Sequence, residues 1–120
     1  MTITKSILAL VTVAAMTGCV YVKKDVVQAP CNLPATVSYA TNIVPILQNN
    51  CYTCHSTNSN LTGILLDNYN TLKTYAQSGT LYGVISHAQG FRAMPDGGAK
   101  LDDCTISTIK KWIDAGAANN

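Results

Sequence analysis

A cysteine pair followed directly by a histidine, Cys51-Tyr-Thr-Cys54-His55, constrains this 120-residue chain more than any other feature. On one helical turn the two thiols face the same side, and the imidazole of His55 lies beside them. The C-x-x-C-H pattern is the attachment site of c-type haem, in which both thiols bond to vinyl groups and a neutral imidazole nitrogen binds the iron. We therefore predict one covalent haem c held by Cys51, Cys54 and His55.

Three other uses of this motif compete with haem attachment. A thioredoxin-like redox pair would need a strand-helix-strand setting, which the sequence lacks. A zinc site would need a fourth ligand and usually a second Cys or His cluster. A structural disulfide between Cys51 and Cys54 would give no role to His55. Export of the chain favours haem, because c-type haem is attached outside the cytoplasm.

Two residues are candidates for the second axial ligand of the iron. Met94 lies in the loop sequence Arg92-Ala-Met-Pro-Asp-Gly-Gly98, where Pro95 stiffens the backbone. We predict that its thioether binds the iron, so that the metal ligands are His55 and Met94. The alternative for Met94 is packing into a gap in the core. His87 is the rival sixth ligand, and would give a lower reduction potential.

The N-terminus predicts export and a lipid anchor. Lys5 precedes an apolar run of about ten residues, typical of a secretory signal peptide and too short to cross a membrane. Met16-Thr-Gly-Cys19 resembles the lipobox of bacterial lipoproteins, which implies a signal peptide over residues 1–18 and lipidation of Cys19. An ordinary signal peptide with a spare thiol is the alternative. We expect lipid attachment on the periplasmic side of the cell envelope, with the outer membrane slightly favoured because Val20 is no Asp-type retention signal.

Residues 19–35 are interpreted as a tether and residues 36–120 as one folded domain. Removal of Lys5 with the signal peptide leaves seven basic and six acidic side chains. This near balance includes no basic patch, so we expect no nucleic-acid partner.

The domain is predicted to be all-α with long irregular connections. The first helix covers about residues 39–48, and Pro45 marks either a kink or a start near Val44. The second covers about residues 71–77, with Asn70 as its N-cap and Gly79 just beyond its end. A domain this small has a thin core, which a haem would fill.

The third predicted helix is the last one. Asp103 or Thr105 caps its beginning, and Gly116 ends it. An apolar stripe runs along it, formed by Ile106, Ile109 and Ile113.

Two cysteines, Cys31 and Cys104, are left after lipidation and haem attachment are assigned. An even remainder in an exported protein indicates a disulfide. Packing of the terminal helices against each other would bring the two together. Two separate free thiols are the alternative.

Together these motifs resemble the cytochrome c family, and more narrowly the short c-type domains of bacterial exported lipoproteins. Besides the haem motif, the shared patterns are Ile43-Val-Pro-Ile-Leu47, Met94-Pro-Asp-Gly-Gly98 and Ile109-Lys-Lys-Trp-Ile-Asp-Ala-Gly-Ala117, in that order over about residues 38–118. The resemblance implies a small class I-like cytochrome c fold of three or more short helices around the haem, with the first and last helices crossing near one haem edge. It also implies that Ile109, Trp112 and Ile113 face the first helix or the haem, and it offers Arg92 as a propionate partner or a solvated residue.

The predicted function is single-electron transfer by a lipid-anchored mono-haem cytochrome. An iron with His55 and Met94 as ligands has no open position for a substrate, so we expect an electron carrier with no catalytic residue and with redox proteins as partners. The nearly neutral charge predicts mild salt dependence of that partnership. The alternative is a haem enzyme, peroxidase-like if Met94 is not bound, or the haem subunit of a larger exported oxidoreductase. A structural lipoprotein without haem is the third class.

Overall fold

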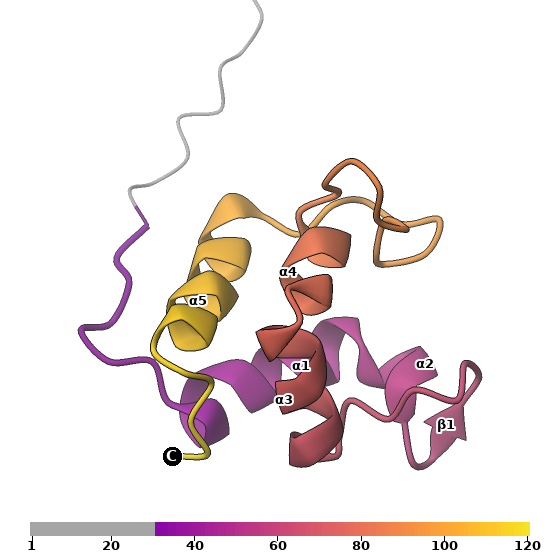
Figure 1. Ribbon diagram of the computed structural model, residues 1–120, viewed down its shortest axis with the longest axis horizontal. Helices are drawn as coiled ribbons and strands as arrows, with labels where there is room; N and C mark the ends of the chain where they lie inside the picture. The colour runs from indigo at the N-terminus through magenta and orange to yellow at the C-terminus, as the bar shows by residue number, and fades with distance from the viewer. Residues whose placement is uncertain (1–30) are drawn as a thin grey trace, which may run out of the picture.

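The computed structural model describes residues 31–120 (Figure 1). The predicted signal peptide, Cys19 and most of the predicted tether lie outside the described residues. Within residues 31–120, no helix combines the length and apolar character needed to cross a bilayer.

The described chain is mostly helical, as the all-α prediction requires. Its single strand has two residues, and α5 is its longest helix. α3 packs against α4, α4 against α5, and α5 against η1. The elements in chain order are η1 (Tyr39–Ile43), α1 (Val44–Asn50), α2 (Tyr52–His55), β1 (Ser59–Asn60), α3 (Tyr69–Gln77), α4 (Thr80–Ile85) and α5 (Asp103–Asp114).

The first predicted helix consists of a π-helical turn, η1, that continues into α1. The α-helix begins at Val44, with Pro45 in its first turn, where the missing N–H leaves no hydrogen bond unmade. Asn120 stabilises the beginning of η1, because its backbone carbonyl accepts from the hydroxyl of Ser38 at 2.8 Å and from the N–H of Ala40 at 3.0 Å. The C-terminal end of the chain therefore lies beside the first helical segment.

The predicted N-caps of α3 and α5 were wrong in position. Asn68, not Asn70, caps α3, and its side-chain oxygen accepts from the N–H of Thr71 at 3.1 Å. Both true caps have extended backbone, which aims the side chain back at the free N–H groups of the first turn.

In α5 the cap is Asp102, whereas Asp103 and Thr105 lie inside the helix. One carboxylate oxygen of Asp102 accepts from the hydroxyl of Thr105 at 2.6 Å, and the other accepts from its backbone N–H at 2.9 Å. The hydroxyl and then the N–H of Thr105 lower the pKa of Asp102. The predicted end of α5 is confirmed, since Gly116 follows the helix with a left-handed φ of 96°.

The sequence did not predict α4. Gly79 was interpreted only as the end of the preceding helix, and Gly83 weakens a helical pattern. In the structure Gly79 has φ 79° and serves both α3, as the residue beyond its end, and α4, as its N-cap. One left-handed residue therefore separates two short helices.

Every helix except α2 contributes to the core, and its largest fully buried side chains come mainly from η1, α1 and α5. Ile43, Leu47 and Trp112 are almost completely buried. The ring of Tyr39 stacks on Trp112 at 5.9 Å between centroids and meets Tyr69 edge-on at 5.2 Å. The first and last helical segments therefore pack together through aromatic side chains.

The predicted stripe of α5 is confirmed in part. Ile106 and Ile109 are buried, whereas Ile113 is only half-buried. Trp112, which the stripe omitted, is 1% exposed, and its indole N–H donates to the carbonyl of Ala118 at 2.9 Å. A buried Trp needs such a partner for its N–H, and the turn after α5 supplies it.

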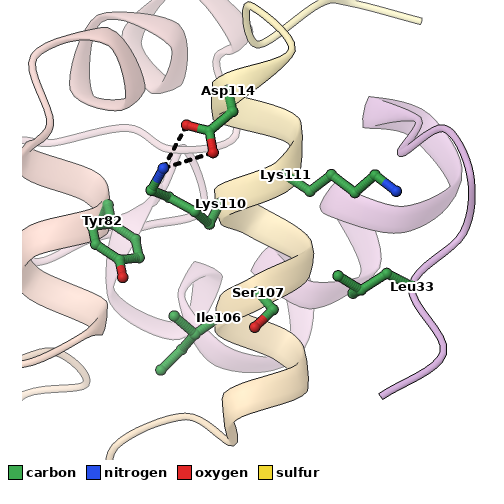
Figure 2. Close-up of a pocket in the computed structure, with 7 residues that line it drawn as sticks. All are labelled: Leu33, Tyr82, Ile106, Ser107, Lys110, Lys111 and Asp114. Carbon is green, nitrogen blue, oxygen red and sulfur yellow. Dashed lines mark hydrogen bonds and ion pairs between the residues drawn. The ribbon is translucent and has the colours of Figure 1, made fainter. Parts of the chain in front are cut away.

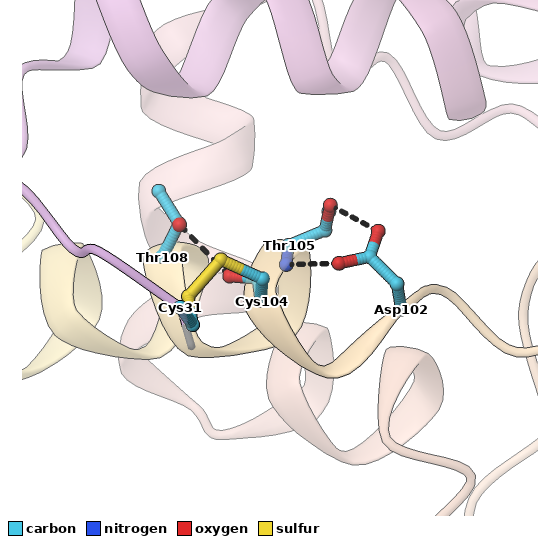
Figure 3. Close-up of a disulfide and its surroundings, with 5 residues drawn as sticks. All are labelled: Cys31, Asp102, Cys104, Thr105 and Thr108. Atoms are coloured by element: carbon cyan, nitrogen blue, oxygen red, sulfur yellow. Dashed lines mark hydrogen bonds between the residues drawn. A yellow bond between two sulfur atoms is a disulfide. The ribbon is translucent and has the colours of Figure 1, made fainter. Parts of the chain in front are cut away.

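Cys31 and Cys104 form a disulfide with 5.3 Å between their Cα atoms (Figure 3). The Nζ of Lys111 donates to the carbonyl of Pro34 at 2.6 Å. Residues 31–35, which the sequence analysis included in the tether, are thus attached along α5.

A shallow hollow of about 320 Å³ lies between this segment, α4 and α5 (Figure 2). Its walls are the apolar side chains of Leu33 and Ile106 and the stems of charged residues. On its rim, the Nζ of Lys110 contacts both carboxylate oxygens of Asp114 at 2.6 Å. The lining contains no residue of the cysteine motif or of the Met94 loop.

Candidate functional site

The cysteine motif forms a single helical turn directly after α1. The N–H of Cys51 still donates to Leu47 at 2.8 Å, and the N–H of His55 donates to the carbonyl of Cys51 at 2.9 Å. The backbone of Cys51, with φ −124°, separates α1 from α2. The thiols of Cys51 and Cys54 are both free and half-buried. One helical turn therefore carries two unlinked thiols and the imidazole of His55.

The ring of His55 is held through one nitrogen only. Its Nδ1 lies 2.8 Å from the hydroxyl oxygen of Thr62 and 3.3 Å from the carbonyl of Ile64. A carbonyl only accepts, so we assign the proton of the neutral ring to Nδ1, which then donates to Ile64. The neutral ring then keeps its lone pair on Nε2, which has no hydrogen-bond partner among the described residues.

The loop that supplies Thr62 and Ile64 is closed onto the motif. The N–H of Leu61 donates to the carbonyl of Cys54 at 3.1 Å, and the N–H of Leu66 donates to the carbonyl of His55 at 2.8 Å. The N–H of Thr57 donates to a carboxylate oxygen of Asp67 at 2.7 Å, which joins the two ends of the loop. These bonds fix the position of the groups that orient the imidazole.

Burial raises the pKa of the Cys51 thiol to about 11. Burial also raises the pKa of the neighbouring Tyr52 to about 12, with smaller contributions from the charges of Tyr39, Asp67 and Cys51. The attacking cysteine of a thioredoxin-like pair needs a lowered pKa, because the thiolate is the reactive form. The environment of Cys51 acts in the opposite direction and disfavours that use of the motif.

The described residues, 31–120, contain no group of three or more His, Cys, Asp or Glu side chains close enough to hold one metal ion. Cys51, Cys54 and His55 therefore do not converge on one point. A structural zinc site requires such convergence of four ligands.

Met94 lies in the irregular connection between α4 and α5. Its N–H donates to the carbonyl of Val84 at 2.9 Å, and its own carbonyl lies 3.0 Å from Nε2 of His87. The Met94 side chain is half-buried. In the view of Figure 1, this orange connection and α2 lie on the same side of α4, away from α5.

Arg92 pairs with a carboxylate of its own loop. Its guanidinium contacts Asp96 through two hydrogen bonds, at 2.7 and 3.3 Å, and its side chain is 72% exposed. The bidentate pair closes the turn that contains Met94 and Pro95.

Two large apolar side chains stand out as exposed in the described part of the chain. Leu61, 75% exposed, follows β1, and Phe91, 43% exposed, lies in the Met94 loop. The ring of Phe91 covers Gly83 of α4 so closely that a Cβ at residue 83 would lie 2.6 Å from ring carbons. The close approach of Phe91 to Gly83 anchors the Met94 loop on α4.

No protein-family model matches the chain, and no curated protein or solved structure is significantly similar to it. The site must be judged on its own residues. The sequence analysis missed Thr62 and Ile64 as partners of His55, and it missed the contact of Phe91 with Gly83. A polar residue beside a glycine, Thr62-Gly63, shortly after the histidine was the one local signal for the first pair.

Proposed function

We propose that this chain is a small c-type cytochrome that transfers single electrons. In this proposal Cys51 and Cys54 bind one haem c covalently, and His55 and Met94 are the axial ligands of its iron. The observation that carries the proposal is the state of His55. Its Nδ1 is held by Thr62 and Ile64, which leaves Nε2 without a hydrogen-bond partner among residues 31–120, on the same turn as two free thiols.

The residues fit the chemistry of haem attachment. Each thiol would add across a vinyl group, so the S–H bond and the C=C bond are replaced by C–S and C–H bonds without any oxidant. The raised pKa of the Cys51 thiol disfavours disulfide exchange, which needs the thiolate. When bound, the haem supplies a reversible one-electron couple.

The residues around His55 would orient the ligand and adjust its basicity. A hydrogen bond from Nδ1–H to Thr62 or Ile64 makes the other ring nitrogen a stronger donor, as outer partners of metal-bound histidines generally do. A thioether at the opposite position raises the reduction potential relative to a second nitrogen ligand.

A carrier needs partners rather than a substrate pocket. With His55 and Met94 both bound to the iron, no position would be left for a substrate, and the chain would hold the haem and contact a redox partner. We propose redox proteins as partners and a lipid anchor at Cys19 on the periplasmic side of the envelope, where the chain would act alone or as a haem subunit of a larger oxidoreductase.

The proposed ligand set has a sharp test because Met94 is the only methionine after residue 16. The mature holoprotein labelled with [methyl-¹³C]methionine should give one methyl signal, strongly shifted upfield in the reduced state by the haem ring current. The oxidised protein should show the far-red iron–thioether band, and a redox titration should fit one electron.

A methyl signal at its ordinary position, together with a high-spin ferric spectrum, would refute His/Met ligation. That result would favour the peroxidase-like alternative, in which the iron has an open position. The Met94→Leu variant should give this high-spin ferric spectrum, and it serves as the reference for an iron that lacks the thioether ligand.

A further inference from the structure

His87 has an unusual backbone and a specific contact. It follows α4 with a left-handed φ of 55°, a region that non-glycine residues rarely occupy, although His is among those enriched there. Such a conformation persists only where surrounding contacts hold it. The contact here is between Nε2 of His87 and the backbone carbonyl of Met94, at 3.0 Å.

This contact completes the hydrogen bonding of the Met94 backbone. The carbonyl can only accept, so Nε2 of His87 carries the proton and donates. On the other side, the N–H of Met94 donates to the carbonyl of Val84, in the last turn of α4, at 2.9 Å. Both polar backbone groups of Met94 are therefore tied to the end of α4, and only side-chain torsions remain free.

We propose that His87 is the positioning residue for the thioether of Met94, an inference that rests on the proposed function. The same nitrogen that could bind iron is used to hold the backbone of the ligand residue. His87 would thus keep Met94 on the iron and slow its replacement by small external ligands, without binding the metal itself.

The hydrogen bond sets the size of the expected effect. Loss of one such bond changes a two-state opening equilibrium by about fivefold. Cyanide binds ferric haem only after Met94 leaves, so its binding rate reports that opening. Loss of the His87 bond should accelerate cyanide binding to the holoprotein about fivefold.

Two variants separate the hydrogen bond from the backbone conformation. His87→Asn keeps a residue that tolerates positive φ, but its amide nitrogen lies near the place of Nδ1 and is too short to reach Met94. His87→Gln places its amide nitrogen near the place of Nε2 and restores the donor. Gln89→Ala, at an exposed position of the same loop, is the matched control.

We expect cyanide to bind about fivefold faster to the Asn variant, with a weaker far-red band, and at close to the parent rate to the Gln and Gln89→Ala variants. Equal rates for the Asn variant and the parent protein would overturn the inference, even if the Asn variant melts at a lower temperature. Equal acceleration in the Asn and Gln variants would also overturn it. Absence of haem, or of the thioether band in the parent protein, would instead refute the proposed function on which it rests.

Discussion

Replacement of Gly83 by Ala tests how the Met94 loop is attached to α4. A Cβ at this position would lie 2.6 Å from Cγ and Cδ2 of Phe91, whereas carbon atoms normally approach to about 3.5–4.0 Å. The whole ring must therefore retreat by about 1 Å. Phe91 is 43% exposed, so the ring has solvent to retreat into and backbone strain is avoided.

Two opposing terms determine the magnitude. Complete burial of a Phe side chain is worth about 1.5–3 kcal/mol, so loss of the half-buried contact of Phe91 costs about 1–1.5 kcal/mol. Ala is better than Gly inside a helix by about 1 kcal/mol. Gly83→Ala alone should therefore change the free energy of unfolding by less than about 0.5 kcal/mol. In a Phe91→Ala background the same substitution should stabilise by about 1 kcal/mol.

The assay is urea unfolding of the four proteins of this double-mutant cycle, each in the same haem state. We expect a coupling energy of about 1 kcal/mol between Gly83 and Phe91. If Gly83→Ala stabilised the protein equally in both backgrounds, the ring would not rest on Gly83 and the reasoning would be refuted.

Three further perturbations have defined outcomes. Replacing both Cys31 and Cys104 by Ser removes a cross-link between residues 73 apart, which is worth about 4.4 kcal/mol in the chain-entropy model. The melting temperature measured by circular dichroism should therefore fall by about 20 °C, and a decrease of less than about 5 °C would contradict this. Thr62→Val removes the hydroxyl that lies closest to Nδ1 of His55, so the reduction potential of the haem protein should rise by up to ~40 mV. Thr62→Ser keeps a hydroxyl and should leave the potential unchanged. An unchanged potential in both variants would argue against tuning by this hydroxyl. Asp102→Ala should cost about 1 kcal/mol at pH 7 by urea unfolding, and Asp102→Asn much less. Because the folded-state pKa of Asp102 is lowered, the part of its contribution that depends on the charge is present above about pH 4 and is lost as the pH falls through that pKa. The difference between the parent and the Ala variant should therefore narrow at low pH, and a constant difference would show that the charge is irrelevant.

Apart from the Cys31–Cys104 disulfide, the features that the sequence predicted correctly are those set by neighbouring residues. The end of α5 at Gly116 depends on one left-handed residue, and the start of α1 at Val44, one of the two alternatives for Pro45, depends on that proline. The turn at Cys51 and His55 likewise follows from spacing alone. Cap positions failed by one to three residues because several Asn, Asp and Thr residues lie close together, and only the backbone conformation decides which one caps.

The parts that failed depend on contacts between distant segments. Thr62 reaches His55 only because the intervening loop closes on itself, and the sequence carries no strong signal for that closure. From the sequence alone, Gly83 disfavours a helix, yet in the structure its missing Cβ makes room for the ring of Phe91. The haem, the ligation by Met94 and the lipid on Cys19 stay predictions.

Haem staining after denaturing gel electrophoresis tests the central claim most directly, because only covalently attached haem survives denaturation. The full chain should be produced in a bacterial envelope that attaches c-type haem. We predict a stained band at the mass of the chain, its loss when Cys51 and Cys54 are both replaced by Ala, and its retention when Cys31 and Cys104 are both replaced by Ser. An unstained band from folded parent protein would contradict the assignment of this chain as a c-type cytochrome.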